Sequence, residues 1–146
     1  MGESKHGPVR WLDRLKLVPA RFSHKPFIRS SWIHSVSEQM DRAVKRPLLN
    51  DEEARAIDRS FHLCQSLIDP DEPEVVHAWI CGRRGDDDRP GLLHWAFVPL
   101  ELRRKKIFTL MTAVVCGQDP VHYTRNCKFV RFPRNYMYNP YRIGDV

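Results

Sequence analysis

The feature that most constrains the fold is the stretch of residues 92–115, LLHWAFVPLELRRKKIFTLMTAVV. It opens with a run of aromatic and branched apolar side chains, interrupted only by His94 and ended by Pro99, which is typical of a buried strand. Apolar residues then recur with the period of an amphipathic helix, at Ile107, Leu110, Met111, Val114 and Val115. The stretch therefore predicts a strand that leads directly into a helix.

Four consecutive cations occupy the predicted junction between strand and helix: Arg103, Arg104, Lys105 and Lys106. Free backbone amides and the positive end of the helix dipole favour an anion at the start of a helix. We therefore expect the basic first turn of this helix to bind an anionic ligand. A net charge of +6 and a pI near 9.4 also favour a polyanionic partner such as nucleic acid, although a basic surface without a specific partner fits the same charge.

Length and composition predict one globular domain over residues 1–146, with a flexible arm over residues 1–12. No cysteine belongs to a C-x-x-C pair, so we interpret all of them as reduced and structural, in a cytosolic protein: Cys64, Cys81, Cys116 and Cys127. No apolar segment is long enough to span a membrane, and no signal peptide is visible. The histidines show no metal-ligand spacing, so we predict no metal site.

Two helices are predicted before the central strands. In residues 25–44, apolar side chains recur every four residues, at Ile28, Trp32, Val36 and Met40. Ser30 and Ser31, near the start of this helix, fit capping, with Trp32 in the core. Alternatively, these serines and Trp32 line an acceptor pocket. Residues 45–49 break the helix, and Asn50 or Asp51 caps a second one whose apolar positions are Ala54, Ile57, Phe61, Cys64 and Ile68.

The remaining segments predict strands. Residues 15–22 form a first strand, which Pro19 makes either an edge strand or a strand with a bulge. Residues 75–82 pair antiparallel with residues 92–98 across a polar loop. Residues 121–123 and 128–132 form two further short strands, and the tail turns at Asn139 and Pro140. The predicted order is strand, helix, helix, strand, strand, helix, strand, strand, and the predicted fold class is α+β.

The sequence resembles the GNAT N-acyltransferase fold, and more specifically the small GNAT-like proteins of tailed bacteriophages. The stretch VPLELRRKKI at residues 98–107 is similar to the phosphate-binding stretch of the family, where a strand and a short acidic turn lead into R-x-x-G-x-G/A. FIRSSWIHS at 27–35, DPDEP at 69–73, LHWAFV at 93–98 and YNPY at 138–141 follow the pattern of the phage proteins in the same order. The resemblance covers about residues 22–143.

This resemblance implies a mixed, mainly antiparallel sheet with helices on both faces, and an acyl-CoA donor such as acetyl-CoA. The positions that match the donor-binding stretch are Phe97, Val98, Arg103, Arg104, Lys105, Lys106 and Ile107. Lys106 and Phe108 stand where the family has glycine and then glycine or alanine, and those small residues let a pyrophosphate approach the backbone. Either basic side chains take over the phosphate contacts, or the protein uses a different donor or none.

Acyl transfer to an amine needs a base, an oxyanion donor and an acid for the leaving thiolate. By the resemblance, a backbone amide near Phe97 and Val98 is the oxyanion donor and Tyr123 is the acid, with Tyr136 and Tyr138 as alternatives. Candidate bases are His94, His77 and Glu101, although each histidine also fits a hydrogen-bonded core residue. The candidate substrate-binding residues are Ser31, Trp32, His77 and Tyr138.

The expected function is that of a phage-encoded N-acyltransferase in the cytoplasm of a bacterial host. Two alternatives remain open. One is a catalytically silent GNAT fold that binds nucleic acid or protein. The other is a DNA base modifier of the Mom type, which the basic charge suits. The transferase hypothesis requires the two central strands to diverge near Val98 and to leave a slot above the following helix.

Overall fold

The computed structural model describes residues 13–39, 47–117, 120–125, 127 and 131–146. Six strands form one sheet in the order β1-β2-β3-β4-β5-β6, with antiparallel pairs as far as β4 and parallel β4–β5 and β5–β6 pairs. The strands are β1 (Lys16–Pro19), β2 (Cys64–Ile68), β3 (Ala78–Arg83), β4 (Gly91–Phe97), β5 (Val121–Tyr123) and β6 (Tyr136–Tyr138). The described α-helices are α2 (Lys25–Gln39), α3 (Pro47–Ser60) and α4 (Ile107–Val115). The predicted α+β class is confirmed.

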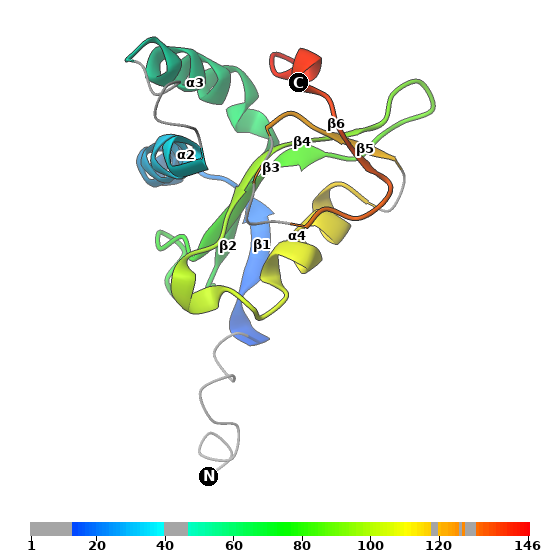
Figure 1. The fold of residues 1–146 in the computed structure, drawn as a ribbon. Coiled ribbons are helices and arrows are strands. Elements are labelled where there is room, and N and C mark those ends of the chain that lie inside the picture. Colours follow the sequence, from blue (N-terminus) through cyan, green and yellow to red (C-terminus); the bar gives the residue numbers. More distant parts are fainter. Residues whose placement is uncertain (1–12, 40–46, 118–119, 126, 128–130) are drawn as a thin grey trace.

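Helices cover both faces of this mixed sheet (Figure 1). Successive side chains of a strand point to opposite faces, so β3 contributes to two cores. Ala78 and Ile80 pack in a cluster with residues of α4, whereas Trp79 and Cys81 pack in a cluster with residues of α2 and α3. Trp79 is fully buried, as is Trp32 of α2, and the rings stack with centroids 5.2 Å apart. None of the described helices is long and apolar enough to cross a membrane.

Several predicted elements are confirmed. The first strand, β1, is an edge strand that ends at Pro19, and the central hairpin pairs β3 antiparallel with β4. Strand β5 has the predicted bounds, and α4 follows β4 as the apolar spacing indicated. The predictions for residues 1–12, for Met40 and for residues 128–130 lie outside the described residues.

The prediction for the second helix was wrong at both ends. Helix α3 begins at Pro47, a residue suited to the first turn of a helix, and ends at Ser60. The last two apolar positions of the predicted helix, Cys64 and Ile68, belong to β2, which lies between β1 and β3. A spacing of four residues keeps two side chains on one side of a strand as well as of a helix, so these positions fit both structures.

The C-terminal region contains a strand that the sequence analysis missed. Tyr136–Tyr138 form β6, which pairs parallel with β5 before the turn at Asn139 and Pro140. The Asn139 side chain accepts a hydrogen bond from the Tyr141 amide, which closes this turn. The tail therefore extends the sheet instead of forming only a turn.

Candidate functional site

Strand β4 contains a bulge at its only polar residue. Cys81 of β3 pairs with Trp95 and Gly82 pairs with Leu93, so His94 is the extra residue between the two pairs. A β-bulge bends its strand and strengthens the local twist. A Cβ on Gly82 would lie 2.5 Å from the Leu92 carbonyl oxygen, so a glycine is required opposite the bulge.

The bulge is where β4 and β5 separate. The described pairing of β4 with β5 ends at Leu93 and Tyr123, and the Thr124 amide makes one more hydrogen bond to the Leu93 carbonyl. Beyond this point β4 continues to Phe97 and stays paired with β3. Strands β4 and β5 therefore diverge at residue 94, four residues before Val98. The two strands of the central hairpin, β3 and β4, do not diverge there, because Trp79 still pairs with Phe97.

A cavity of about 480 Å³ lies beside the free part of β4; we call it the wedge cavity. Its described lining comes from β4, the loop that follows, the start of α4, and one side of α2: Ser35, Glu38, Trp95, Ala96, Phe97, Val98, Leu102, Arg103, Arg104, Lys106, Ile107, Phe108, Thr109 and Cys127. All the predicted donor-binding residues line it except Lys105. The structure therefore brings together most of the residues that the sequence analysis grouped.

The basic loop has an unusual backbone. The prediction that the four cations form the first turn of the helix was wrong, because α4 begins at Ile107 and the cations precede it. Arg104 and Lys106 both adopt the left-handed conformation, with φ of 65° and 61°. This conformation is strained for side chains with a Cβ and favours glycine. Lys106 thus follows the backbone path that a glycine would take, and the first backbone amides of α4, which come next, have no partner within the helix.

We expect the strain at Lys106 to be measurable with two substitutions that remove the same charge. Lys106→Gly should be more stable than Lys106→Ala by roughly 1 kcal/mol, because only glycine adopts the left-handed conformation without a steric cost. Urea denaturation of both variants measures this difference. An advantage for alanine, the usual order at an exposed position, would contradict the left-handed backbone.

His94 makes hydrogen bonds through both ring nitrogens. Its Nε2 lies 2.7 Å from the Asp145 backbone carbonyl oxygen, which can only accept, so Nε2 carries the proton. Its Nδ1 lies 2.9 Å from Thr124 Oγ1 and 3.4 Å from Arg125 Nη1. Burial and the neighbouring Arg125 lower the pKa of His94 to about 4, against the raising effect of its bond to Asp145. These contacts favour the interpretation of His94 as a core residue over that of a free proton acceptor.

A buried ion pair continues this network. Arg125 Nε lies 2.8 Å from Glu53 Oε1, with both side chains less than a tenth exposed. Trp32 Nε1 donates to Glu53 Oε2 over 3.1 Å, and the Arg125 guanidinium lies 5.3 Å from the centre of a Trp32 ring. Arg125 Nη1 also donates to Thr124 Oγ1. The network therefore ties α2 and α3 to the segment that follows β5.

Of the residues predicted to cap the helix or to line an acceptor pocket, Ser31 and Trp32 lie in the core, whereas Ser30 is exposed. Ser31 is inside α2, where its hydroxyl donates to the Phe27 carbonyl over 2.6 Å and accepts from Trp79 Nε1 over 2.8 Å. Trp32 is fully buried, as the first interpretation predicted. The capping role of Ser31 was wrong, and neither Ser31 nor Trp32 lines the wedge cavity within the described residues.

The other predicted catalytic and substrate residues are dispersed. Glu101 is exposed in the short turn after β4, outside the described lining of the wedge cavity. Tyr123 stacks on Phe132 at 3.8 Å and lines a pocket of about 30 Å³ beside His94. Tyr138 is 48% exposed on β6, and His77 precedes β3. Tyr123 lies beside the wedge cavity, because its pocket shares Trp95, Ala96, Phe108 and Cys127 with that cavity.

The sequence analysis missed the part of α2 that lines the wedge cavity. Ser35 Oγ accepts a hydrogen bond from Trp95 Nε1 over 2.7 Å and so joins α2 to β4 beyond the bulge. One turn later, Glu38 is the carboxylate among the described lining residues. Ser31, Ser35 and Glu38 are spaced as neighbours on one helical face, and this periodicity was the available signal.

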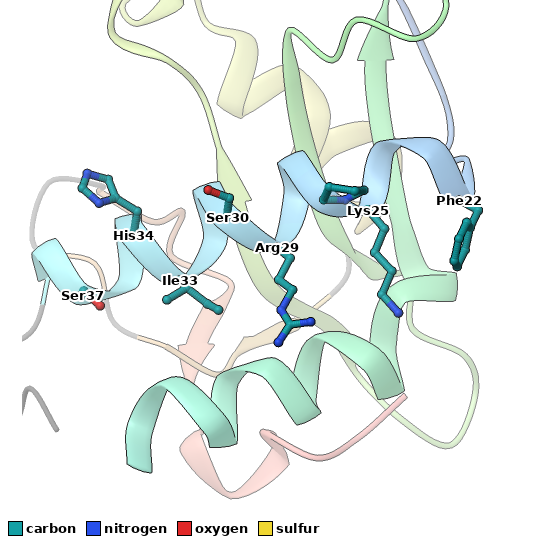
Figure 2. A pocket seen from close by; sticks show the side chains of 8 residues that line it. Phe22, Lys25, Arg29, Ser30, Ile33, His34 and Ser37 are labelled. Carbon is teal, nitrogen blue, oxygen red and sulfur yellow. The ribbon is translucent and has the colours of Figure 1, made fainter. Parts of the chain in front are cut away.

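A second and larger depression of about 720 Å³ runs along the outer side of α2; we call it the α2 groove (Figure 2). Its described lining consists of Phe22, Lys25, Pro26, Arg29, Ser30, Ile33, His34 and Ser37. In Figure 2, Lys25, Arg29 and Ile33 point from α2 toward α3. His34 Nε2 of this groove and Glu38 Oε1 of the wedge cavity lie 3.0 Å apart, so the two cavities adjoin at this contact.

Comparisons with known proteins identify no relative of this chain, so its function is argued from the geometry of the site. No family model, curated protein or solved structure matches this chain.

Proposed function

We propose that the protein is a GNAT-like N-acyltransferase that transfers an acyl group from an acyl-CoA-type donor to an amine. The observation that carries this proposal is the separation of two parallel strands at a bulge, with a cavity of about 480 Å³ between the free part of β4 and the start of α4. A volume of this size suits a ligand of cofactor or drug size. We further propose, from the resemblance alone, that the protein is phage-encoded and acts in the cytoplasm of a bacterial host.

The residues at the cavity mouth fit an anionic donor. Arg104 and Lys106 line the cavity and form no ion pair with any described residue, so their charges are available to phosphates. Arg103 is oriented by a hydrogen bond from its Nε to the Val98 carbonyl at 3.0 Å. The Phe108 ring packs edge-on against Phe132 at 6.1 Å, which holds this larger residue against the cavity wall. The left-handed loop and the basic side chains thus replace the expected glycines.

The residues around the wedge cavity also provide groups for the chemistry. An acyl-CoA donor supplies a thioester, whose carbonyl carbon forms a bond to the amine nitrogen while its bond to sulfur breaks. Backbone amides on the edge of β4 that has left β5 can donate to the oxygen that becomes negative. Glu38 is the described carboxylate in the wall that can accept the proton of the amine. Tyr123, which lines the small pocket next to the wedge cavity, remains the proposed acid that protonates the leaving thiolate.

Calorimetric titration with acetyl-CoA tests the proposal. We expect one molecule to bind per chain, and we expect Lys106→Ala to weaken binding about tenfold, as the loss of a charge-assisted contact does. Lys105→Ala is the matched control, because this neighbouring lysine does not line the cavity and should leave the affinity unchanged. Equal effects of the two substitutions would show that only the overall charge matters.

The alternative function is that of a binding module. The observation that favours it is the run of exposed cations at residues 103–106, which form no ion pairs with described residues and therefore suit a polyanion. If acetyl-CoA does not bind at millimolar concentration, a DNA titration at several salt concentrations decides between nucleic acid and protein. Affinity for DNA should fall with a log–log slope of roughly −0.9 per phosphate contact.

A further inference from the structure

The α2 groove is larger than the wedge cavity, and no step proposed above uses it. The groove extends from Phe22, in the short turn before α2, along α2 to Ser37, and its volume of about 720 Å³ is within the range of small-molecule sites. The aromatic ring of Phe22 is 81% exposed at one end. An exposed aromatic ring beside a groove offers an apolar surface on which a ligand can stack.

Charge in the groove has one dominant sign. Lys25 and Arg29 lie one helical turn apart and point the same way, toward α3 (Figure 2). Lys25 is paired with Asp58 of α3 at 2.9 Å. Arg29 forms no ion pair with any described residue, although its charge, after that of Lys25, also helps to lower the pKa of Asp58. The described lining contains no carboxylate. A ligand with an oxyanion is therefore attracted to this groove, and a polycation is repelled.

The groove also adjoins the proposed donor site. His34 lines the groove, Glu38 lines the wedge cavity, and the side chains are 3.0 Å apart. The two residues are separated by one turn near the end of α2, so a ligand that lies along the groove has one end next to the wedge cavity. A transferase needs two adjoining sites of this kind, one for each substrate.

We propose that the α2 groove is the acceptor site and that the acceptor is a small amine carrying an oxyanion and an apolar or aromatic group. The assignment of the groove as an acceptor site rests on the proposed acyltransferase function. The preference of the groove for anions does not, because it follows from the residues that line the groove. Arg29 binds the oxyanion, Phe22 and Ile33 contact the apolar part, and the amine lies toward the His34–Glu38 pair. Polyamines and other polycationic amines are excluded as substrates.

Two aromatic amines of matched structure test the preference: O-phosphotyrosine, which carries a phosphate and a carboxylate, and tyramine, which carries neither. Calorimetry with the full chain should show phosphotyrosine binding at least about tenfold more tightly than tyramine, because of charge-assisted contacts. Equal affinities, or tighter binding of tyramine or spermidine, would overturn the proposal.

Three substitutions locate the site. Arg29→Gln should remove most of the preference for phosphotyrosine, whereas Arg55→Gln, the same change at an exposed arginine of α3 outside the groove lining, should not. Asp58→Asn should strengthen phosphotyrosine binding, because it frees Lys25 from its partner. Because misfolding can only weaken binding, tighter binding by Asp58→Asn would show that the ligand lies next to Lys25. Unchanged affinity in both Arg29→Gln and Asp58→Asn would place the ligand elsewhere.

The same titration with acetyl-CoA present separates the two proposals. Phosphotyrosine should still bind one to one in the presence of saturating acetyl-CoA, and Arg29→Gln should leave the affinity for acetyl-CoA unchanged. Displacement of phosphotyrosine by acetyl-CoA would show that both occupy the wedge cavity, and the groove would not be the acceptor site. If acetyl-CoA fails to bind while the Arg29-dependent preference persists, the transferase function falls and the acceptor assignment falls with it.

Discussion

Replacing Arg125 by methionine should lower the free energy of unfolding by about 3–5 kcal/mol, the usual loss when one partner of a buried ion pair is removed. The Glu53 carboxylate would keep its bond to Trp32 Nε1 but would lose its cation, with its side chain only 9% exposed. Arg125 also holds the hydroxyl of Thr124, so the substitution removes two of the links in the network. Urea denaturation at neutral pH measures the loss.

Two further variants give this prediction its controls. Glu53→Leu combined with Arg125→Met should recover much of the loss, because a buried ion pair replaced by apolar side chains of similar volume often costs little. Arg21→Met breaks an exposed pair with Glu74 and should change stability far less. An Arg125→Met loss no larger than that of Arg21→Met would show that the Glu53–Arg125 pair is not buried in solution.

Stability should also rise with pH between about 4 and 6.5 because of His94. The pKa of His94 is lowered to about 4 in the folded state, mainly by burial, while an unfolded histidine titrates near 6.5. In this interval the unfolded chain binds more protons than the folded chain, so lowering the pH favours unfolding. The stabilisation from a neutral His94 is complete above pH 6.5 and is lost toward pH 4, and it amounts to about 3 kcal/mol.

The difference between wild type and His94→Gln isolates this contribution from the titration of carboxylates. We expect the free energy of unfolding of His94→Gln to depend less on pH between 4.5 and 7, in urea denaturation at several pH values. His34→Gln, at a residue whose side chain is 76% exposed, should keep the pH dependence of the wild type. The same slope in wild type and His94→Gln would mean that His94 titrates freely in the folded protein.

Both predictions concern the network that shapes the wedge cavity. His94 is the bulged residue of β4, and it is held from one side by Thr124, just after β5, and from the other by the Asp145 carbonyl. Arg142 Nε pairs with the Asp145 side chain at 2.8 Å, which fixes the C-terminal turn that supplies this carbonyl. A bulge leaves backbone groups unpaired, and side-chain contacts around it compensate for this cost. The separation of β4 from β5 therefore depends on hydrogen bonds from two distant segments, the residues after β5 and the C-terminal turn.

Much of the candidate site was predictable because its signals are local. The apolar run before Pro99, the helical period from Ile107 and the cations between them are all encoded within one continuous stretch. Local order brings such residues together in any fold that contains the strand and the helix, so most predicted donor-binding residues line one cavity. Lys105 is the exception, since side-chain direction in a left-handed loop does not follow from the order of residues.

The sequence by itself determined the strand–loop–helix unit, the central hairpin and the burial of Trp32, because periodicity and proline act through neighbouring residues. Only the tertiary structure decided that residues 64–68 form a strand, that His94 is a bulge, and that α2 supplies Ser35 and Glu38 to one cavity and Arg29 to another. These features depend on which segments pack together across long stretches of chain, and a spacing of four residues fits both a helix and a strand until that packing selects one.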